Sequence, residues 1–207
     1  MRRSLMVCLG VICSTTVYGW NTVSELENEA SLALVSPENL LGAAFVSNIN
    51  ISVQSTNLLM KLDAEIIRSI IHYQQFLDSA DGQAIDGQLQ CISNVVNWTD
   101  TMTNTWQFWT GRLLLASVYA VDNNFTSAYD VCTNNLCAMQ IFGGVSETNV
   151  LNTAILKYYE MPDLDVGMAF KVFAGMAAAG AGMGNAATNY ANQVGNPYRS
   201  MIFDFIR

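Results

Sequence analysis

The chain contains few of the residues that most often carry catalysis or bind metals. Among its 207 residues there are one histidine, His72, and five cysteines. A general base needs a nucleophile or substrate nearby and a partner that orients it, and the sequence around His72 supplies neither. The spacing of histidine and cysteine also fits no zinc motif. We therefore interpret His72 as a half-buried residue on the flank of a helix, and we predict no catalytic residue, no metal site and no cofactor.

Basic residues are also scarce. Nine Lys and Arg oppose 17 Asp and Glu, which gives a net charge of −8, and lysine occurs only at positions 61, 157 and 171. Such an acidic chain disfavours nucleic acid and anionic membrane surfaces as electrostatic partners. Hydrophobic residues make up 51% of the chain and charged residues only 13%. This composition supports a buried core and is not that of a disordered protein.

The N-terminus lacks an apolar run that is long enough to span a bilayer. Arg2 and Arg3 precede a short apolar stretch at 5–12, and small residues follow as far as Gly19. This layout is typical of a secretory signal peptide, although a buried N-terminal helix is the alternative. We predict a signal peptide at 1–19 and a mature, secreted chain that begins near Trp20.

Three Asn-X-Ser/Thr triplets begin at Asn50, Asn97 and Asn124. In a protein that passes through a eukaryotic secretory route, such asparagines are acceptors for N-linked glycans. In a bacterial protein the triplets would carry no meaning. Together with the predicted signal peptide, they predict an extracellular glycoprotein.

Removal of the signal peptide leaves three cysteines, an odd number that allows one disulfide and one free thiol, or an intermolecular bridge. Cys132 and Cys137 flank the turn-like sequence 133–136 and are able to close a small loop. Cys91 is predicted on the flank of a helix, where it can reach a neighbouring segment instead. All three are disulfide candidates, and the sequence does not choose among the pairings.

The apolar periodicity predicts an all-α protein. In the most regular stripe the steps alternate between three and four residues, which is the spacing that keeps one face of a helix against a partner. This stripe consists of Ile92, Val95, Thr99, Met102, Trp106, Trp109, Leu113 and Ala116. It predicts one continuous helix over 83–121. If Ile92 is position a, then Asn97 is position f and faces solvent.

A second stripe of the same kind predicts a helix before the turn sequence at 78–82. It consists of Leu59, Leu62, Ile66, Ser69, Tyr73 and Phe76. Two long helices joined by a short turn make an antiparallel hairpin. We therefore predict a helical bundle of five or six helices, built around a long antiparallel helical hairpin.

Local signals mark the remaining helix ends. Ser24 and Glu27 match a capping box, and Pro37 follows Ser36 as at a helix start. The sequence 122–124 predicts a break. A helix interrupted near Asn134 should follow, and another should open at 146–148.

The C-terminal segment at 166–207 differs in composition from the predicted bundle domain at 20–165. Residues 166–183 are rich in Ala, Gly, Met and Phe and contain one charge, Lys171. Its glycines, at 175, 180, 182 and 184, match neither a phosphate loop nor a dinucleotide motif. We favour a helix that uses small residues to pack closely on the bundle. The alternative is an apolar segment that inserts into a membrane.

Two further groups of side chains allow a structural and a functional interpretation. The aromatic residues Trp98, Trp106, Phe108, Trp109 and Tyr119 can form core or line an apolar pocket, and we favour core. The acids Asp63, Glu65, Asp78, Asp81 and Asp86 lack the loop pattern of a calcium or glycosidase site, so we predict solvated carboxylates. The leading function is that of a secreted, non-enzymatic glycoprotein that binds a protein or a small apolar ligand. The alternative is a membrane-active protein that uses residues 166–183.

Overall fold

The computed structural model describes residues 19–143 and 149–206, and every regular element in these ranges is an α-helix. The predicted all-α bundle is confirmed, with eleven helices in the described ranges rather than the five or six expected. Nearly all of the predicted signal peptide, and the helix start predicted at 146–148, lie outside the described residues. The helices are α1 (Val23–Val35), α2 (Pro37–Leu40), α3 (Ala43–Ser52), α4 (Leu58–Ser79), α5 (Gly82–Trp98), α6 (Trp106–Val121), α7 (Phe125–Phe142), α8 (Val150–Tyr158), α9 (Val166–Gly180), α10 (Gly184–Gln193) and α11 (Tyr198–Ile206).

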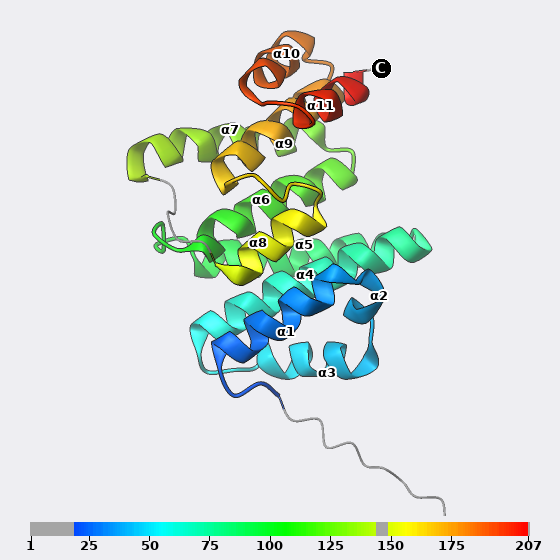
Figure 1. Ribbon diagram of the computed structural model, residues 1–207, viewed down its shortest axis with the longest axis vertical. Coiled ribbons are helices and arrows are strands. Elements are labelled where there is room, and N and C mark those ends of the chain that lie inside the picture. The colour runs from blue at the N-terminus through cyan, green and yellow to red at the C-terminus, as the bar shows by residue number, and fades with distance from the viewer. Residues whose placement is uncertain (1–18, 144–148, 207) are drawn as a thin grey trace, which may run out of the picture.

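The helices stack along the long axis of the molecule in nearly the order of the chain. Figure 1 shows α3 at one end and α10 with α11 at the other, with α4, α5, α6 and α9 between them. The exception is α8, which returns to pack against α1. As a result, the N-terminal and C-terminal helices form opposite ends of the stack, and α6 and α8 lie between them.

The turn predicted between the first two long helices is present. Helix α4 ends with Ala80 in the left-handed conformation, and the side chain of Asp81 accepts a hydrogen bond from the backbone N–H of Gln83 at the start of α5. The two helices pack against each other. The second arm is much shorter than predicted, because α5 ends at Trp98 and the single helix expected over 83–121 is wrong.

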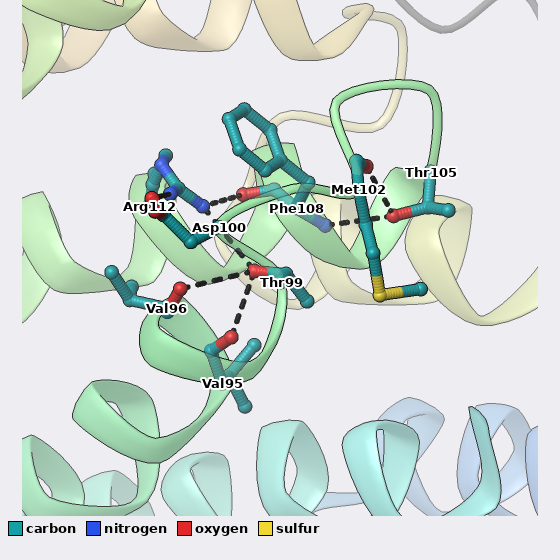
Figure 2. Close-up of polar contacts among 8 residues, drawn as sticks. All are labelled: Val95, Val96, Thr99, Asp100, Met102, Thr105, Phe108 and Arg112. Atoms are coloured by element: carbon teal, nitrogen blue, oxygen red, sulfur yellow. Dashed lines mark hydrogen bonds and ion pairs between the residues drawn. The ribbon is translucent and has the colours of Figure 1, made fainter. Parts of the chain in front are cut away.

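Side-chain hydrogen bonds of two threonines mark the interruption of the predicted long helix (Figure 2). Thr99 Oγ1 donates to the Val95 carbonyl at 2.7 Å. Thr105 Oγ1 donates to the Met102 carbonyl at 2.9 Å and accepts from the Phe108 N–H at 3.4 Å, which caps α6. Such side-chain bonds to local backbone groups compete with a continuous helix and favour its ends.

Arg112, the seventh residue of α6, contacts the residues of this break. Its Nη1 donates to Thr99 Oγ1 at 3.3 Å, its Nη2 lies 3.4 Å from Asp100 Oδ1, and its guanidinium lies 3.5 Å from the ring centre of Phe108. The non-helical segment from Thr99 to Thr105 is one heptad long. The apolar spacing therefore crosses the break without a change of register, which explains why the stripe looked continuous.

Buried side chains form two cores. The N-terminal core is built mainly by α1, α3, α4 and α5, and the C-terminal core by α7, α9, α10 and α11. Helix α6 contributes Trp106 and Leu114 to the first and Trp109 and Leu113 to the second. Helix α8 also contributes buried side chains to both cores, so α6 and α8 connect the two cores.

Two of the predicted local signals need correction. The capping box at the start of α1 is formed by Thr22 and Glu25, not by Ser24 and Glu27. Helix α7 runs without interruption past Asn134. The start at Pro37 is confirmed, although α2 is only four residues long.

The Gly- and Ala-rich sequence forms α9, which packs against α6, α7, α10 and α11. A Cβ atom added at Gly175 would lie 2.5 Å from Ile202, and one added at Gly180 would lie 2.6 Å from Phe125. These glycines therefore allow a close approach of neighbouring elements, as the packing interpretation expects. Within the described ranges, no helix combines the length and the apolar character needed to cross a bilayer.

Candidate ligand-binding pocket

A cavity of about 770 Å³ opens where the two cores meet. Its volume lies within the range of small-molecule sites in proteins. The walls are supplied by eight helices, α1, α2, α4, α6, α7, α8, α9 and α11, and by the turns that follow α6 and α8, and most of the side chains are apolar. The lining residues are Leu34, Val35, Pro37, Tyr73, Gln74, Leu77, Ser117, Ala120, Val121, Asn123, Phe125, Ala154, Lys157, Tyr158, Tyr159, Glu160, Met161, Phe173, Met176, Met201 and Phe205.

Aromatic rings form a continuous wall of this pocket. Tyr73 stacks on Tyr159 with ring centres 5.6 Å apart, and Tyr158 meets Tyr159 edge-on at 5.3 Å. Phe173 extends the wall from α9, with its ring centre 6.4 Å from that of Tyr159. Aromatic pairs in these geometries attract each other by more than the burial of their surface accounts for. The rings of this wall therefore hold one another in defined positions.

The end of α8 fixes the position of Tyr159. Glu160 adopts a left-handed conformation with φ 61°, and its N–H donates to the Lys157 carbonyl at 3.0 Å. The N–H of Met161 donates to the Leu156 carbonyl at 2.7 Å. This pair of hydrogen bonds is the Schellman arrangement, in which glycine usually occupies the left-handed position. The buried side chains of Leu156 and Met161 both join the C-terminal core, which holds the turn in place.

Half of the eight polar side chains that line the pocket are neutral hydroxyls. Tyr158 donates to Gln74 Oε1 at 2.8 Å, and Gln74 Nε2 in turn donates to Asp78 Oδ1 at 2.9 Å. The Tyr159 hydroxyl oxygen is buried. The side chain of Ser117 is its hydrogen-bonding neighbour and opposes the rise in the pKa of Tyr159 that burial causes.

Burial keeps these phenols protonated. It raises the pKa of Tyr159 well above its ordinary value, and the nearby Tyr73 and Tyr158 raise it further. Burial also raises the pKa of Tyr158, and it raises that of Tyr73, to which the charge of Glu160 adds. At neutral pH the three groups are therefore hydrogen-bonding hydroxyls and not phenolate bases.

Exposed apolar side chains form the rim. Val35 is 66% exposed, Leu77 is 54% exposed and Phe205 is 47% exposed, and all three line the cavity. Large apolar side chains gathered at the mouth of a concave site are typical of surfaces that bind another molecule. Lys157 and Glu160, both exposed, are the charged residues of the lining.

The aromatic residues considered from the sequence lie elsewhere. Trp106, Phe108 and Trp109 are buried in the two cores, and Trp98 and Tyr119 are half-buried outside the pocket lining. The favoured core interpretation holds for the three buried rings. The pocket tyrosines were missed because Tyr73 was assigned to an interhelical stripe, and because nothing in the sequence links it to a turn some 85 positions later.

Two of the acids predicted to be solvated are buried. Asp63 is 0% exposed and accepts from Gln107 Nε2 at 2.9 Å, and Glu65 is 1% exposed. Burial raises the pKa of Asp63 to about 8, and the nearby carboxylate of Glu27 adds to this effect while Gln107 opposes it. Helix α4 is covered by several neighbours, so its polar face lies inside the molecule. Asp78, Asp81 and Asp86 are exposed, as predicted.

Glu65 belongs to a separate polar cluster between α4 and α5. Its Oε2 lies 2.7 Å from Arg68 Nη2, and its Oε1 accepts from Asn94 at 3.2 Å. Arg68 Nε also donates to Cys91 Sγ at 3.2 Å. Burial nevertheless raises the pKa of the Cys91 thiol to about 11, so this thiol is not an activated nucleophile.

The other predicted positions stay apart from the pocket. Cys91 and Cys132 are buried, Cys137 is exposed, and all three are free thiols. Cys132 and Cys137 lie within one continuous helix, because the turn expected at 133–136 is helical. Asn50, Asn97 and Asn124 are all exposed.

His72 is half-buried, as expected, with Nδ1 3.1 Å from Gln75 Oε1. Burial lowers its pKa. Among the residues that the structure describes, no three His, Cys, Asp or Glu side chains gather as metal ligands. The chain matches no protein-family model, no curated protein and no solved structure.

Proposed function

We propose that this chain is a secreted, non-enzymatic glycoprotein that binds a small apolar molecule in the pocket between its two cores. The observation that carries the proposal is the cavity of about 770 Å³, with its tyrosine wall and apolar rim. Ligand sites of this kind are mostly apolar and contain a few polar groups that fix orientation. The combination favours a small ligand over the broad, flat contact that a protein partner requires.

The chemistry of the lining favours binding over catalysis. The phenols are held protonated by burial, and the charged side chains, Lys157 and Glu160, stand exposed. General acid–base catalysis requires a group whose pKa lies near the working pH and which reaches the reacting atom. The described lining contains no histidine or cysteine to provide one.

Secretion and glycosylation remain part of the proposal on sequence grounds. The layout of 1–19 supports export, and the exposure of Asn50, Asn97 and Asn124 is compatible with glycans on all three. Recovery of the protein from a eukaryotic culture medium with Met1 still in place would contradict the predicted signal peptide and a mature chain that begins near Trp20. The alternative, membrane action by residues 166–183, requires α9 to leave its packed position among four helices first.

A pair of leucine variants tests the pocket. The neutral fluorescent probe N-phenyl-1-naphthylamine should bind the full chain saturably at one site. Leu77→Glu places a charge on the rim and should weaken binding by about tenfold, which corresponds to about 1.4 kcal/mol. Leu32→Glu is the matched control, because Leu32 is 65% exposed on α1 and does not line the cavity.

The controls separate loss of the site from loss of the fold. Both leucines are exposed, so both variants should keep the melting temperature of the parent chain. An absence of saturable binding by the parent chain would overturn the proposed function. So would an equal loss of affinity in the two variants.

A further inference from the structure

We infer that Asp63 and Glu27 form a carboxyl pair that shares one proton, and that this proton holds α1 against α4. Helix α1 is docked most firmly while the proton is held, so its docking depends on pH. Leu34 and Val35, near the end of α1, line the pocket, so the carboxyl pair also holds part of the pocket wall in place.

The carboxyl pair lies between helices that are distant in the sequence. Asp63 is 0% exposed, and its Oδ1 accepts from Gln107 Nε2 at 2.9 Å. Its Oδ2 is buried and receives no hydrogen bond from a donor in the described residues. Glu27, which is half-buried on α1, is the hydrogen-bonding neighbour of Asp63, and Glu27 Oε1 accepts from Asn149 Nδ2 at 2.7 Å. Because Asn149 caps α8, Glu27 connects α1 to both α4 and α8.

Two carboxyl groups in this arrangement need a proton between them. Ionised carboxylates contain only acceptor oxygens, so two of them repel each other and form no hydrogen bond. If Asp63 is protonated, its O–H donates to Glu27, and the buried oxygen gains a partner. Burial raises the pKa of Asp63 to about 8; Gln107 opposes this rise and Glu27 adds to it. The proton is therefore held on Asp63 at neutral pH.

The cations on the neighbouring helices lie elsewhere. On α4, Arg68 pairs with Glu65 at 2.7 Å, and Lys61 Nζ lies 4.3 Å from the centre of an indole ring. Arg112 of α6 lies at the break after α5, and Lys157 of α8 is exposed. Helix α3 contains no charged side chain. The remaining acids and the histidine on α4 and on the helices packed against it are exposed or lie against α5: Glu25, Glu29, Glu38, Asp78, Asp86 and His72. Within the described residues, a proton is thus the positive charge available to the pair.

The shared proton links the docking of α1 to pH. When α1 leaves α4, Asp63 meets water and its pKa returns towards the ordinary value of 3.8. Because the value in the folded protein is raised, the pair favours docking fully below pH 4, and this contribution is lost as the pH rises through 8. Each pH unit in this window favours the released helix by up to about tenfold. We therefore expect α1 to open more often at pH 7 than at pH 5.

Hydrogen exchange of the full chain, followed by mass spectrometry, measures this opening. The parent chain is compared with Asp63→Asn, whose introduced amide accepts from Gln107 and donates to Glu27 at every pH. The intrinsic exchange rates of α1 are the same in both chains, so the ratio of the parent rate to the variant rate reports docking alone. We expect this ratio to rise by about tenfold to a hundredfold between pH 5 and pH 7. At pH 7 the amides of α1 should also exchange faster than those of α4, because α1 opens by itself.

Two variants of α1 identify the partner of Asp63. Glu27→Gln should reduce the change with pH, because the introduced amide donates to the ionised carboxylate of Asp63. Glu29→Gln is the matched control, since it also removes one acid from α1, but Glu29 is exposed and should not affect the change with pH. Thermal melting of the three variants verifies that they are folded.

The opposite results would each overturn the inference. An exchange ratio that does not change with pH, or a full change retained in Glu27→Gln, would show that the two carboxyl groups do not share a proton. Loss of the change in Glu29→Gln would assign it to the net charge of α1. Identical exchange rates in α1 and α4 would show that α1 does not open separately. Slower exchange of α1 when calcium is added at pH 7, in the parent chain but not in Asp63→Asn, would show that the pair holds a metal cation instead.

Discussion

The two cores of this protein are packed from different kinds of side chain. Seven isoleucines and six leucines are buried in the N-terminal core. The C-terminal core buries one isoleucine, six alanines and four aromatic residues. In the first, branched side chains fill the space between helices. In the second, small residues let helices approach closely, and a few large rings fill what remains.

The comparison explains the place of the pocket. Helices α6 and α8 take part in both cores, so each must match two neighbours with different packing. Close-packed interiors leave few voids larger than a water molecule. A cavity of about 770 Å³ at the boundary is therefore a feature that neither core fills, and the tyrosines of α4 and α8 line it.

The largest change in the free energy of unfolding is expected from a substitution of Asp63, the buried acid of the N-terminal half. Asp63→Asn keeps the shape of the side chain, and the introduced amide is still able to accept from Gln107. The substitution removes the need to bury a carboxylate. We expect it to raise the free energy of unfolding at pH 8 by several kcal/mol, with an upper bound of about 6 kcal/mol, because each unit of pKa shift corresponds to about 1.4 kcal/mol.

The raised pKa of Asp63 determines how its contribution to the free energy of unfolding changes with pH. The pKa of Asp63 is about 8 in the folded protein, above the ordinary value of 3.8. The group therefore favours the folded state fully below pH 4, and this contribution is lost as the pH rises through 8. Urea denaturation at pH 5 and pH 8 should show a larger gain for Asp63→Asn at pH 8. An equal gain at both values would contradict the shifted pKa.

A glycine substitution probes the C-terminal half. Gly175→Ala should lower the free energy of unfolding by about 1–3 kcal/mol, the usual cost of overpacking a core. The added methyl group would lie 2.5 Å from Ile202 Cδ1, so the packing of α9 on α11 must shift. The change is measured by chemical denaturation, with one slope of unfolding free energy against denaturant concentration used for the parent chain and the variant.

The matched control for this substitution lies in the N-terminal half. At Gly82, the first residue of α5, an added Cβ meets no atom within 4 Å. Gly82→Ala should leave stability unchanged or raise it slightly, because alanine favours helices over glycine. Equal costs at the two glycines would show that close approach does not distinguish the C-terminal core.

The fold class was accessible from the sequence because its signals are local. The alternating three- and four-residue steps of α4, the helix start at Pro37 and the turn sequence at 78–82 act within one or two turns, so periodicity and turn chemistry located them. The break between α5 and α6 was not accessible. A turn of one heptad preserves the spacing of the stripe, and only the threonine bonds at Thr99 and Thr105 reveal it.

The site depended on contacts that no local pattern encodes. Tyr73 and Tyr159 come together only because α8 folds back towards α1 and α4. The burial of Asp63 has the same origin. Its helix has a regular apolar stripe, which predicts that the opposite face is solvated, and further helices then cover that face. Long-range packing therefore decided both the pocket and the buried acid.

The smallest change in the free energy of unfolding is expected at the end of α4, in the N-terminal half. Ala80 ends α4 in the left-handed conformation with φ 53°, which is unfavourable for a residue with a Cβ atom. Ala80→Gly should therefore raise the free energy of unfolding by about 0.5–1 kcal/mol. Asn123, which follows α6, is also left-handed with φ 58°, but asparagine tolerates that conformation, so Asn123→Gly should change stability less. Thermal melting of the two variants side by side measures the difference, and a larger gain at Asn123 would show that backbone strain is not what limits the end of α4.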